Sequence, residues 1–411
     1  MQSIDQMSDA DLVSAVAATV RRPRREPADS FVLHAPLELA ARAALLPRVT
    51  PDARPAARRQ IAAIAPRYES FGPGVAEPKA IDFDSAEDAA TRLGEAVAAG
   101  DLDDVDAVAQ WLGRRTSASE IRALLADLIV PSLAAAAHGT IFLFQLPRIS
   151  PRGELTVELL RPLARELARQ PEWRLRRFED RPSDGPQSAE TLFAALQATP
   201  RLGVPGSDFI YPLMSQVERT GVAEALLALP TGNVDFDAGA RVILRAAALS
   251  MLQESGEHAP YGWSHCLTLP QAALGVAPWC ADPTIALAVA ATYVVGFRAA
   301  LAHAPLDGRY APPVPRADLV TALEDAPEEA AAAVWHAPSD RMAGIATTLA
   351  SRAAVHRDAH LVKYTLACLD AAAWDRDSAL LYLSAAAALH GWWAEADAST
   401  RDTAASARSI R

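Results

Sequence analysis

The segment from Val355 to Cys368 carries two side chains that can do chemistry when they are buried. His360 and Lys363 lie three residues apart among apolar residues with helical spacing, so both are expected on one face of a helix. Lysine is rare in this chain: of the 39 basic residues, Lys79 and Lys363 are lysines and the others are arginines. Arginine stays protonated, whereas a buried lysine can become a nucleophile, a base or a carboxylated metal ligand. The alternative for Lys363 is a side chain that buries its stem and keeps its charge in water.

Three further histidines, His34, His138 and His265, lie in apolar segments that favour helices. Glu38 follows His34 by four residues, which places an acid on the same helix face. A histidine in apolar surroundings needs partners for both ring nitrogens, and a structural hydrogen bond would satisfy each one taken alone. Helical bundles build metal sites from side chains on facing helices. With His360 added, four separate apolar helices each contribute one imidazole, which predicts a shared metal site.

These residue types favour a redox-active metal ion. Imidazoles suit iron, copper or zinc, and an added carboxylate favours a hard ion such as iron. A neutral amine of Lys363 can trap carbon dioxide as an anionic carbamate, which would supply that carboxylate. Glu38 could instead orient His34 through its second ring nitrogen, as acids around metal ligands do. His356 is the rival ligand near His360, and its charged neighbours indicate a position nearer solvent.

Helices must position these side chains, because the composition predicts an all-α protein. Hydrophobic residues make up 51% of the 411 residues, alanine runs favour helices, and few alternating strand patterns occur. We expect a large multi-helix bundle, or two closely packed helical halves at residues 1–175 and 176–411 that share the metal site. The boundary lies in the polar, Pro/Gly-rich connection from Pro171 to Gln187.

The expected helices follow from apolar periodicity and capping residues. Ser8 is a candidate N-cap, Pro131 begins the apolar helix that carries His138, and the tail at residues 396–411 is expected to be disordered. Other helices are expected at about residues 8–20, 54–65, 85–99, 102–112, 117–129, 155–168, 189–198, 212–229, 238–253, 283–301, 341–355 and 378–392.

Charge, cysteines and missing motifs limit the function classes. The net charge of -11 argues against a nucleic-acid partner, which needs a basic face. Three cysteines without CxxC spacing indicate a reducing compartment. The polar N-terminus does not resemble a secretory signal, and the longest apolar run, residues 285–297, is shorter than a bilayer span. We therefore expect a cytoplasmic protein without a membrane partner. GxGxxG, Walker A and GxSxG motifs are absent from the sequence.

Four segments resemble blocks of a known family: LHAPLELAARAAL, HGTIFLFQLPR, HCLTLPQAAL and AHLVKYTLA. In this order, from residue 34 to about residue 390, they resemble the questin oxidase-like proteins, which are oxygenases of secondary metabolism. The resemblance implies oxidative ring opening of an anthraquinone-type or related aromatic polyketide, by Baeyer–Villiger insertion or dioxygenase cleavage. It also implies non-haem Fe(II) with molecular oxygen as co-substrate. The implied ligands are His34, His138, His265, His360 and a carboxylated Lys363.

The sequence departs from this family after the second and third blocks. Gln145 and Gln271 stand where further polar residues or histidines are expected, which indicates a rebuilt substrate pocket. With these two glutamines, Phe142, Tyr261 and Trp263 are the expected pocket wall for a small aromatic substrate. Two alternatives stay open: a metal-free Baeyer–Villiger-type monooxygenase, and a non-catalytic helical binding protein whose histidines make only structural hydrogen bonds.

Overall fold

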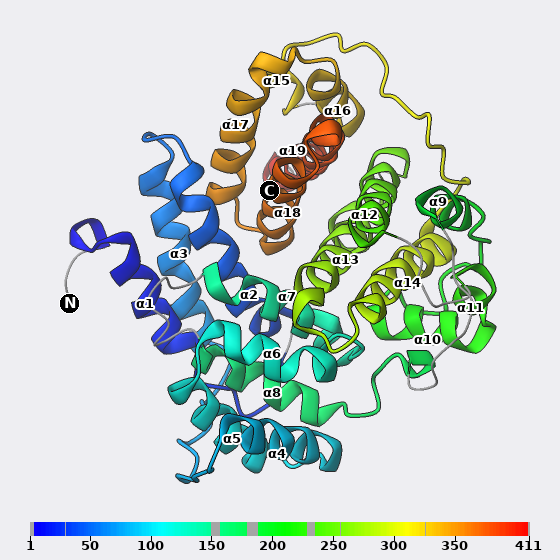
Figure 1. The fold of residues 1–411 in the computed structure, drawn as a ribbon. Coiled ribbons are helices and arrows are strands. Elements are labelled where there is room, and N and C mark those ends of the chain that lie inside the picture. The colour runs from blue at the N-terminus through cyan, green and yellow to red at the C-terminus, as the bar shows by residue number, and fades with distance from the viewer. Residues whose placement is uncertain are drawn as a thin grey trace.

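The computed structural model describes residues 4–28, 30–148, 157–178, 188–227, 235–254, 256–324 and 326–409. Over these ranges the chain consists of helices and short helical turns without a strand (Figure 1). Extended backbone pairs there in two isolated bridges, Arg24 with Gly74 and Ser132 with Arg174. The predicted all-α multi-helix bundle is confirmed.

The helices are numbered in chain order, and two short turns matter for the site. These turns are η3 (Ala134–Ala137) and η7 (Ala259–Trp263). The helices are α1 (Asp9–Val20), α2 (Ser30–Leu45), α3 (Arg54–Glu69), α4 (Ala86–Ala99), α5 (Leu102–Arg115), α6 (Ala118–Ile129), α7 (His138–Gln145), α8 (Leu160–Arg169), α9 (Ala189–Gln197), α10 (Ile210–Thr220), α11 (Val222–Leu227), α12 (Phe236–Gln253), α13 (Ser264–Val276), α14 (Pro283–Leu301), α15 (Leu319–Ala322), α16 (Pro327–Trp335), α17 (Met342–Val355), α18 (Ala359–Trp374) and α19 (Ala379–Ser409).

Local capping explains several helix starts. The Ser8 side chain accepts a hydrogen bond from the backbone N–H of Asp11 at the start of α1, and Ser117 makes a capping box with Glu120 at α6. Asp358 accepts from the backbone N–H groups of His360 and Leu361 in the first turn of α18, the helix that carries His360 and Lys363. These bonds satisfy backbone donors that the helix itself leaves unpaired, so the chain enters each helix at a defined residue.

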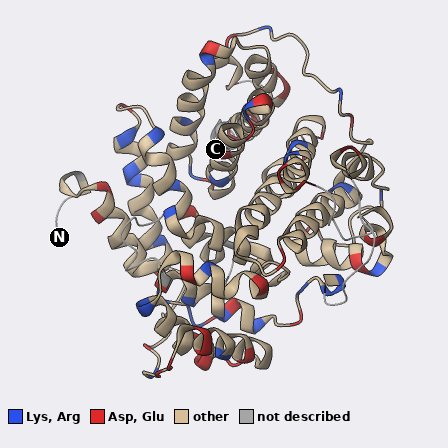
Figure 2. Cartoon of the chain, viewed as in Figure 1, with Lys and Arg blue, Asp and Glu red and all other residues tan. Residues whose placement is uncertain are grey.

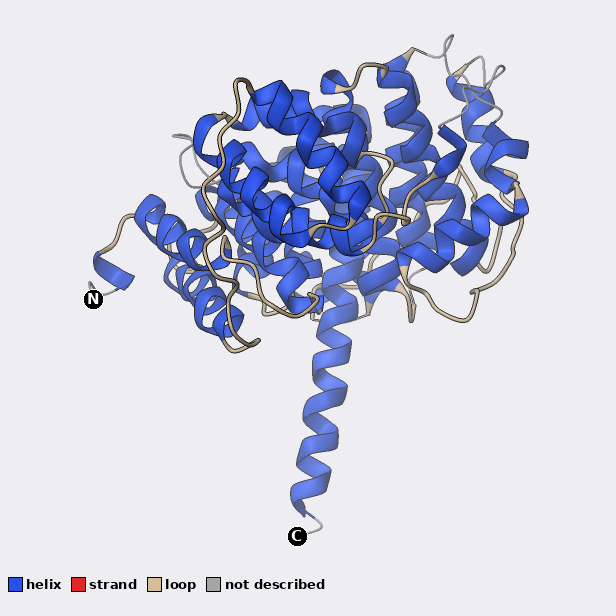
Figure 3. Ribbon diagram, turned by 90° about the horizontal axis from the view of Figure 1, so that it is seen from below, coloured by secondary structure: helices blue, strands red, loops and turns tan. Residues whose placement is uncertain are grey.

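The predictions for residues 212–229 and for the C-terminal tail are wrong. The segment predicted as one helix over 212–229 forms α10 and α11, because Gly221 adopts a left-handed conformation with φ 64° and ends α10. The tail predicted to be disordered continues α19 to Ser409, and Figure 3 shows this helix projecting from the body of the protein. The predicted start of the 155–168 helix and part of the predicted linker, residues 179–187, lie outside the described residues.

One hydrophobic core runs through both predicted halves. Buried residues of α2 and α7 belong to the same cluster as those of α13, α14 and α18. Figure 1 shows α12, α13 and α14 side by side, and these three helices contact one another. The four helices that carry the imidazoles lie on both sides of residue 175 and pack against one another. A division of the chain into two halves there stays a prediction.

Helix α14 is the most apolar of the core helices. It is long and apolar enough to cross a membrane by length and composition, but 89% of the apolar window is buried inside the protein. Core helices of soluble proteins meet the same criterion, so α14 is weak evidence for a membrane. In Figure 2, cationic and anionic residues are both scattered over the outer helices, while α12 to α14 are mostly uncharged.

Candidate metal centre

Four helices that contact one another in a closed circuit surround the candidate centre. Helix α2 contacts α7 and α18, and α13 also contacts α7 and α18. The labels of these four helices lie together in the middle of Figure 1. Side chains that face the inside of such a circuit must meet, even though the helices are far apart in sequence.

The structure brings the four imidazoles together at this point. Ring centroids lie 4.6 Å apart for His34 and His138, 4.5 Å for His34 and His360, and 5.2 Å for His265 and His360. The exposed fraction of each of these residues is at most 7%. Spacing in the sequence predicted the helix that carries each histidine, and packing of the helices produces the cluster.

A left-handed turn, which the sequence analysis did not predict, positions His138. Instead of one helix from Pro131, the chain makes η3, in which Ala135, Ala136 and Ala137 have φ values of 52°, 52° and 59°. A non-glycine residue in this region costs about 1–2 kcal/mol. Strained backbone of this kind clusters at functional sites. Here the turn places the carbonyl oxygen of Ala135 2.9 Å from Nδ1 of His138.

Hydrogen bonds to backbone carbonyls determine the tautomers of two imidazoles. Nδ1 of His138 donates to the carbonyl of Ala135, and Nδ1 of His265 donates to the carbonyl of Tyr261 in η7. A carbonyl oxygen can only accept, so both Nδ1 atoms carry the proton and a neutral ring then has a lone pair on Nε2. The two Nε2 atoms lie 3.3 Å apart. Two lone pairs therefore face each other at this distance. A cation between them would stabilise both, and Nε2 of His34, 2.9 Å from Nε2 of His138, is a second possible partner for His138.

Protonation does not relieve this arrangement at neutral pH. Burial is the main cause that lowers the pKa of His34, His138 and His265 well below the usual value, and neighbouring positive groups lower it further. Burial and Lys363 also lower the pKa of His360 to about 4, against the opposing effect of Asp358. Neutral imidazoles are the form that binds metals. The four imidazoles are therefore in the protonation state that metal binding requires at neutral pH.

The distances fit a small metal ion. One nitrogen from each of His34, His265 and His360 can be chosen so that all three lie within 4.8 Å of one another. Nε2 of His34 also lies 2.9 Å from Nε2 of His138. Ligand nitrogens at about 2.0–2.1 Å from a tetrahedral ion are about 3.3 Å apart, so small side-chain movements would bring these nitrogens into a first coordination shell. The donor set passes this test for iron, zinc or copper.

Lys363 lies next to the imidazoles without a hydrogen-bond partner of its own. Its Nζ atom is buried and bonds to no group within the described part of the chain. Burial lowers its pKa to about 7, against the opposing charges of Asp358 and Glu38. Lys363 in turn lowers the pKa of each of the four histidines, which places its charge close to all of them. Much of this amine is neutral near pH 7, as carbamate formation requires.

Glu38 and His356 have other partners. Oε1 of Glu38 accepts from Nε of Arg42 at 2.7 Å, and Oε2 has no hydrogen-bond partner in the described ranges. Orientation of His34 by Glu38 therefore stays a prediction, and its shown role is to pair with a buried arginine. His356 is half-buried; its Nδ1 accepts from the backbone of Asp358, and its Nε2 lies 3.7 Å from Asp397. His356 is thus not among the clustered imidazoles.

A cavity of about 260 Å³ adjoins the centre. All four histidines line it, together with apolar, aromatic and acidic groups from α2, η3, the residues at and just before the start of α10, η7 and α14. These other lining residues are Leu33, Ala136, Asp208, Phe209, Ile210, Tyr261 and Phe297. Of the five predicted pocket residues, Tyr261 alone is in this lining.

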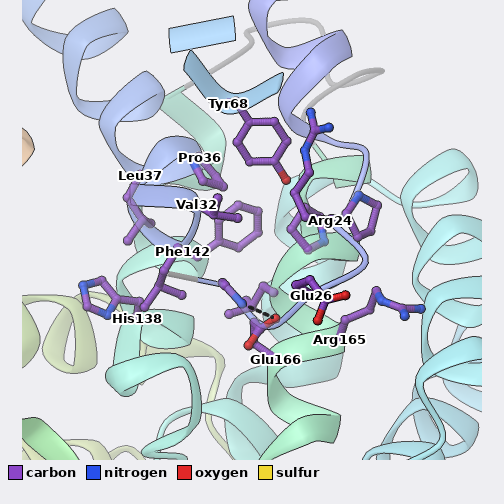
Figure 4. A pocket seen from close by; sticks show the side chains of 15 residues that line it. Arg24, Glu26, Val32, Pro36, Leu37, Tyr68, His138, Phe142, Arg165 and Glu166 are labelled. Carbon is purple, nitrogen blue, oxygen red and sulfur yellow. Dashed lines mark hydrogen bonds between the residues drawn. The ribbon is translucent and has the colours of Figure 1, made fainter. Parts of the chain in front are cut away.

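The other four predicted pocket residues do not line this cavity. Figure 4 shows Phe142 beside His138 in a separate hollow of about 20 Å³, which is space for about one water molecule. Trp263 is fully buried in the core, and Gln145 is buried too. Nε2 of Gln271 donates to the carbonyl of Ala367 at 2.8 Å, so this side chain ties α13 to α18. Phe142 thus lines the smaller hollow, and the other three side chains pack between helices instead of facing the cavity.

Sequence reasoning missed the wall that Asp208, Phe209, Ile210 and Phe297 form. The first three lie at the end of a Gly/Pro-containing segment and the start of α10, and Phe297 lies in the uniformly apolar α14. Neither segment has a polar residue at a spacing that marks a site. The signal that reveals them is spatial, because α10 and α14 pack against each other beside the imidazoles.

Comparison of the chain with protein-family models found no match, and comparisons with curated proteins and with solved structures found none either.

Proposed function

We propose that this protein is a non-haem iron-dependent oxygenase that cleaves a ring of an anthraquinone-type or related polycyclic aromatic natural product. The observation that supports it most is the pair of Nε2 lone pairs of His138 and His265, which face each other at 3.3 Å among four buried imidazoles. The substrate class rests on the resemblance of the four histidine-containing segments to questin oxidase-like proteins.

The residues that would hold the iron are His34, His138, His265, His360 and, as its carbamate, Lys363. Bound ferrous iron would supply a site that activates dioxygen for attack on an electron-rich ring. The carbonyls of Ala135 and Tyr261 hold the rings of His138 and His265 in the tautomer that leaves Nε2 available.

Other groups of the chain exclude water and balance charge. Leu33, Ile210 and Phe297 give the cavity an apolar wall next to the imidazoles. The carboxylates of Glu38 and Asp358 favour the protonated form of the Lys363 amine, and burial opposes them. Formation of the carbamate from the neutral amine would place an anion at this position, which offsets the charge of a divalent metal.

The cavity volume favours partial entry of the substrate. A cavity of about 150 Å³ binds a single benzene ring, so the 260 Å³ here suits about two fused rings. In the proposed function, the reactive end of the polycyclic substrate enters the cavity beside the histidines, and the other end of the substrate lies at the mouth of the cavity.

The decisive experiment measures metal in untagged protein purified anaerobically and reconstituted with ferrous iron. Stoichiometric iron, its loss in His265→Gln and its retention in the matched control His356→Gln are expected, with oxygen uptake on a hydroxyanthraquinone in its reduced form. Protein that holds no stoichiometric transition metal under these conditions would contradict the proposal.

Three measurements separate the alternatives. Activity that survives a strong chelator would favour the metal-free Baeyer–Villiger-type monooxygenase. Full activity and metal content in Lys363→Arg would remove Lys363 from the centre, because Arg keeps the charge but cannot form a carbamate. Ligand binding without turnover by protein that takes up no metal would favour the non-catalytic binding protein.

A cytoplasmic location and the absence of nucleic-acid and membrane partners are part of the same proposal. The three cysteines, Cys266, Cys280 and Cys368, are free, which fits a reducing compartment.

A further inference from the structure

Two aromatic side chains at the mouth of the 260 Å³ cavity are exposed without an apolar cover. Phe209 is 60% exposed and Tyr261 is 50% exposed, and both line the cavity. An exposed large apolar group is costly, whereas a bound flat ring would bury it. The Tyr261 ring is already held by an edge-to-face contact with His360, with centroids 4.8 Å apart at 89°.

Asp208 lies at the same mouth of the cavity. Among the described residues that line the cavity, it has the only carboxylate. The Asp208 side chain is 55% exposed, and Nδ1 of His258 lies 3.8 Å from its Oδ2. This distance is too long for a hydrogen bond, so the carboxylate can accept one from a ligand. The nearby N-terminus of α10 carries about half a positive charge, so it does not cancel the full negative charge of the Asp208 carboxylate.

We propose that Asp208 is the specificity-determining residue of the cavity and accepts a hydrogen bond from a hydroxyl of the substrate, while Phe209 and Tyr261 hold the ring that bears it. This inference rests on the proposed function for its substrate class, a hydroxylated fused aromatic. It adds the orientation, because the hydroxyl at Asp208 directs the opposite end of the ring system to the imidazoles.

The test is a binding cycle that does not depend on turnover. Chelator-treated protein is titrated with 2-naphthol and with 2-methoxynaphthalene, which has similar shape but no donor. Wild-type protein is compared with Asp208→Ala and with the control Asp52→Ala, which removes an exposed carboxylate away from the cavity. Because a hydrogen bond to a charged acceptor is lost, Asp208→Ala is expected to lower the naphthol-to-methoxynaphthalene affinity ratio by about three- to tenfold.

A second variant locates the bound ring. Phe209→Ala is expected to weaken both probes by a similar factor and to leave their ratio unchanged, because the ring loses an apolar contact and keeps its acceptor. An unchanged ratio in Asp208→Ala, an equal loss in Asp52→Ala, or no binding of either probe to the wild type would overturn the inference.

This cycle fails separately from the proposed function. A ratio that depends on Asp208 in a protein that never oxidises an aromatic compound would support the recognition role and reject the oxygenase. Oxygenase activity together with a ratio independent of Asp208 would do the reverse.

Discussion

At the scale of single residues, Lys363 has surroundings that an ordinary lysine avoids. Its amine is buried and lacks a hydrogen-bond partner in the described part of the protein, although arginine serves as nearly every other cation in the chain. A buried, unpaired polar group costs about 1–3 kcal/mol. Replacing the amine by an apolar group should therefore raise the free energy of unfolding. The size of this rise measures how much stability the protein gives up to keep the amine.

We predict that Lys363→Met stabilises the metal-free protein by about 2 kcal/mol at pH 7, because a thioether of similar length needs no hydrogen bond. The pKa of Lys363 is about 7 in the folded state and 10.5 in the unfolded state. The unfolded chain therefore binds more protons between these values, so wild-type stability rises with pH across this window. Urea unfolding at pH 7 and pH 10 measures both effects.

The control for this prediction is Lys79→Met, which replaces the other, exposed lysine and should change stability by less than about 0.5 kcal/mol. The same rise with pH in Lys363→Met as in the wild type would show that the buried amine does not cause it.

The imidazoles predict a loss of stability in acid. Burial lowers the pKa of His360 to about 4, against 6.5 in the unfolded chain, so the unfolded state binds more protons between these values. Stability is therefore lost as pH falls from 6.5 towards 4, by about 3 kcal/mol from His360 alone. Urea unfolding of His360→Asn should show a shallower decline, whereas the exposed His303→Asn should follow the wild type.

At the scale of elements, the site depends on two irregular turns that precede regular helices. The left-handed η3 presents the carbonyl of Ala135 to His138, and the π-helical η7 presents the carbonyl of Tyr261 to His265. The carbonyl of Ala135 also accepts a hydrogen bond from the backbone N–H of His138. Irregular backbone thus provides the acceptors that determine which nitrogen of each ring faces the centre.

We predict that Ala136→Gly stabilises the protein by about 1 kcal/mol, because glycine adopts the φ of 52° without strain and little packing is lost beside the cavity. Thermal or urea unfolding measures the change. The matched control is the exposed Ala63→Gly in α3, where glycine should destabilise the helix by about 1 kcal/mol. Destabilisation of equal size at both positions would show that the turn at Ala136 is not strained.

At the scale of the whole molecule, a metal ion at this centre would join four helices that lie on both sides of the predicted boundary. Each helix also contributes to the single hydrophobic core. An ion that binds the folded chain alone stabilises all of these contacts together, by about 2.7 kcal/mol at a free concentration of 100 times Kd.

We therefore predict that ferrous iron or zinc raises the Tm by about 3 °C for a chain of this length, and that a chelator reverses the rise. Calorimetry or circular dichroism measures it. The rise should vanish in His265→Gln and persist in His356→Gln, whose histidine lies outside the cluster. Equal rises in both variants would place the ion elsewhere.

Local sequence patterns are enough to predict the helices and the residues from which a site could be built. Helical periodicity, alanine content and caps such as Ser8 depend on neighbours within a few residues, so they predicted the bounds of α14 and the apolar helices that carry His34, His138, His265 and His360.

The tertiary structure alone decided which nitrogens face the centre, where the cavity lies and which partner Glu38 has. The 3.3 Å approach of His138 to His265, the lining by Asp208 and Phe209, and the pairing of Glu38 with Arg42 appear once the helices are packed. The imidazole cluster and the cavity depend on contacts between segments more than 50 residues apart in the chain. Local preference does not encode such contacts, because they form when distant apolar faces leave water together.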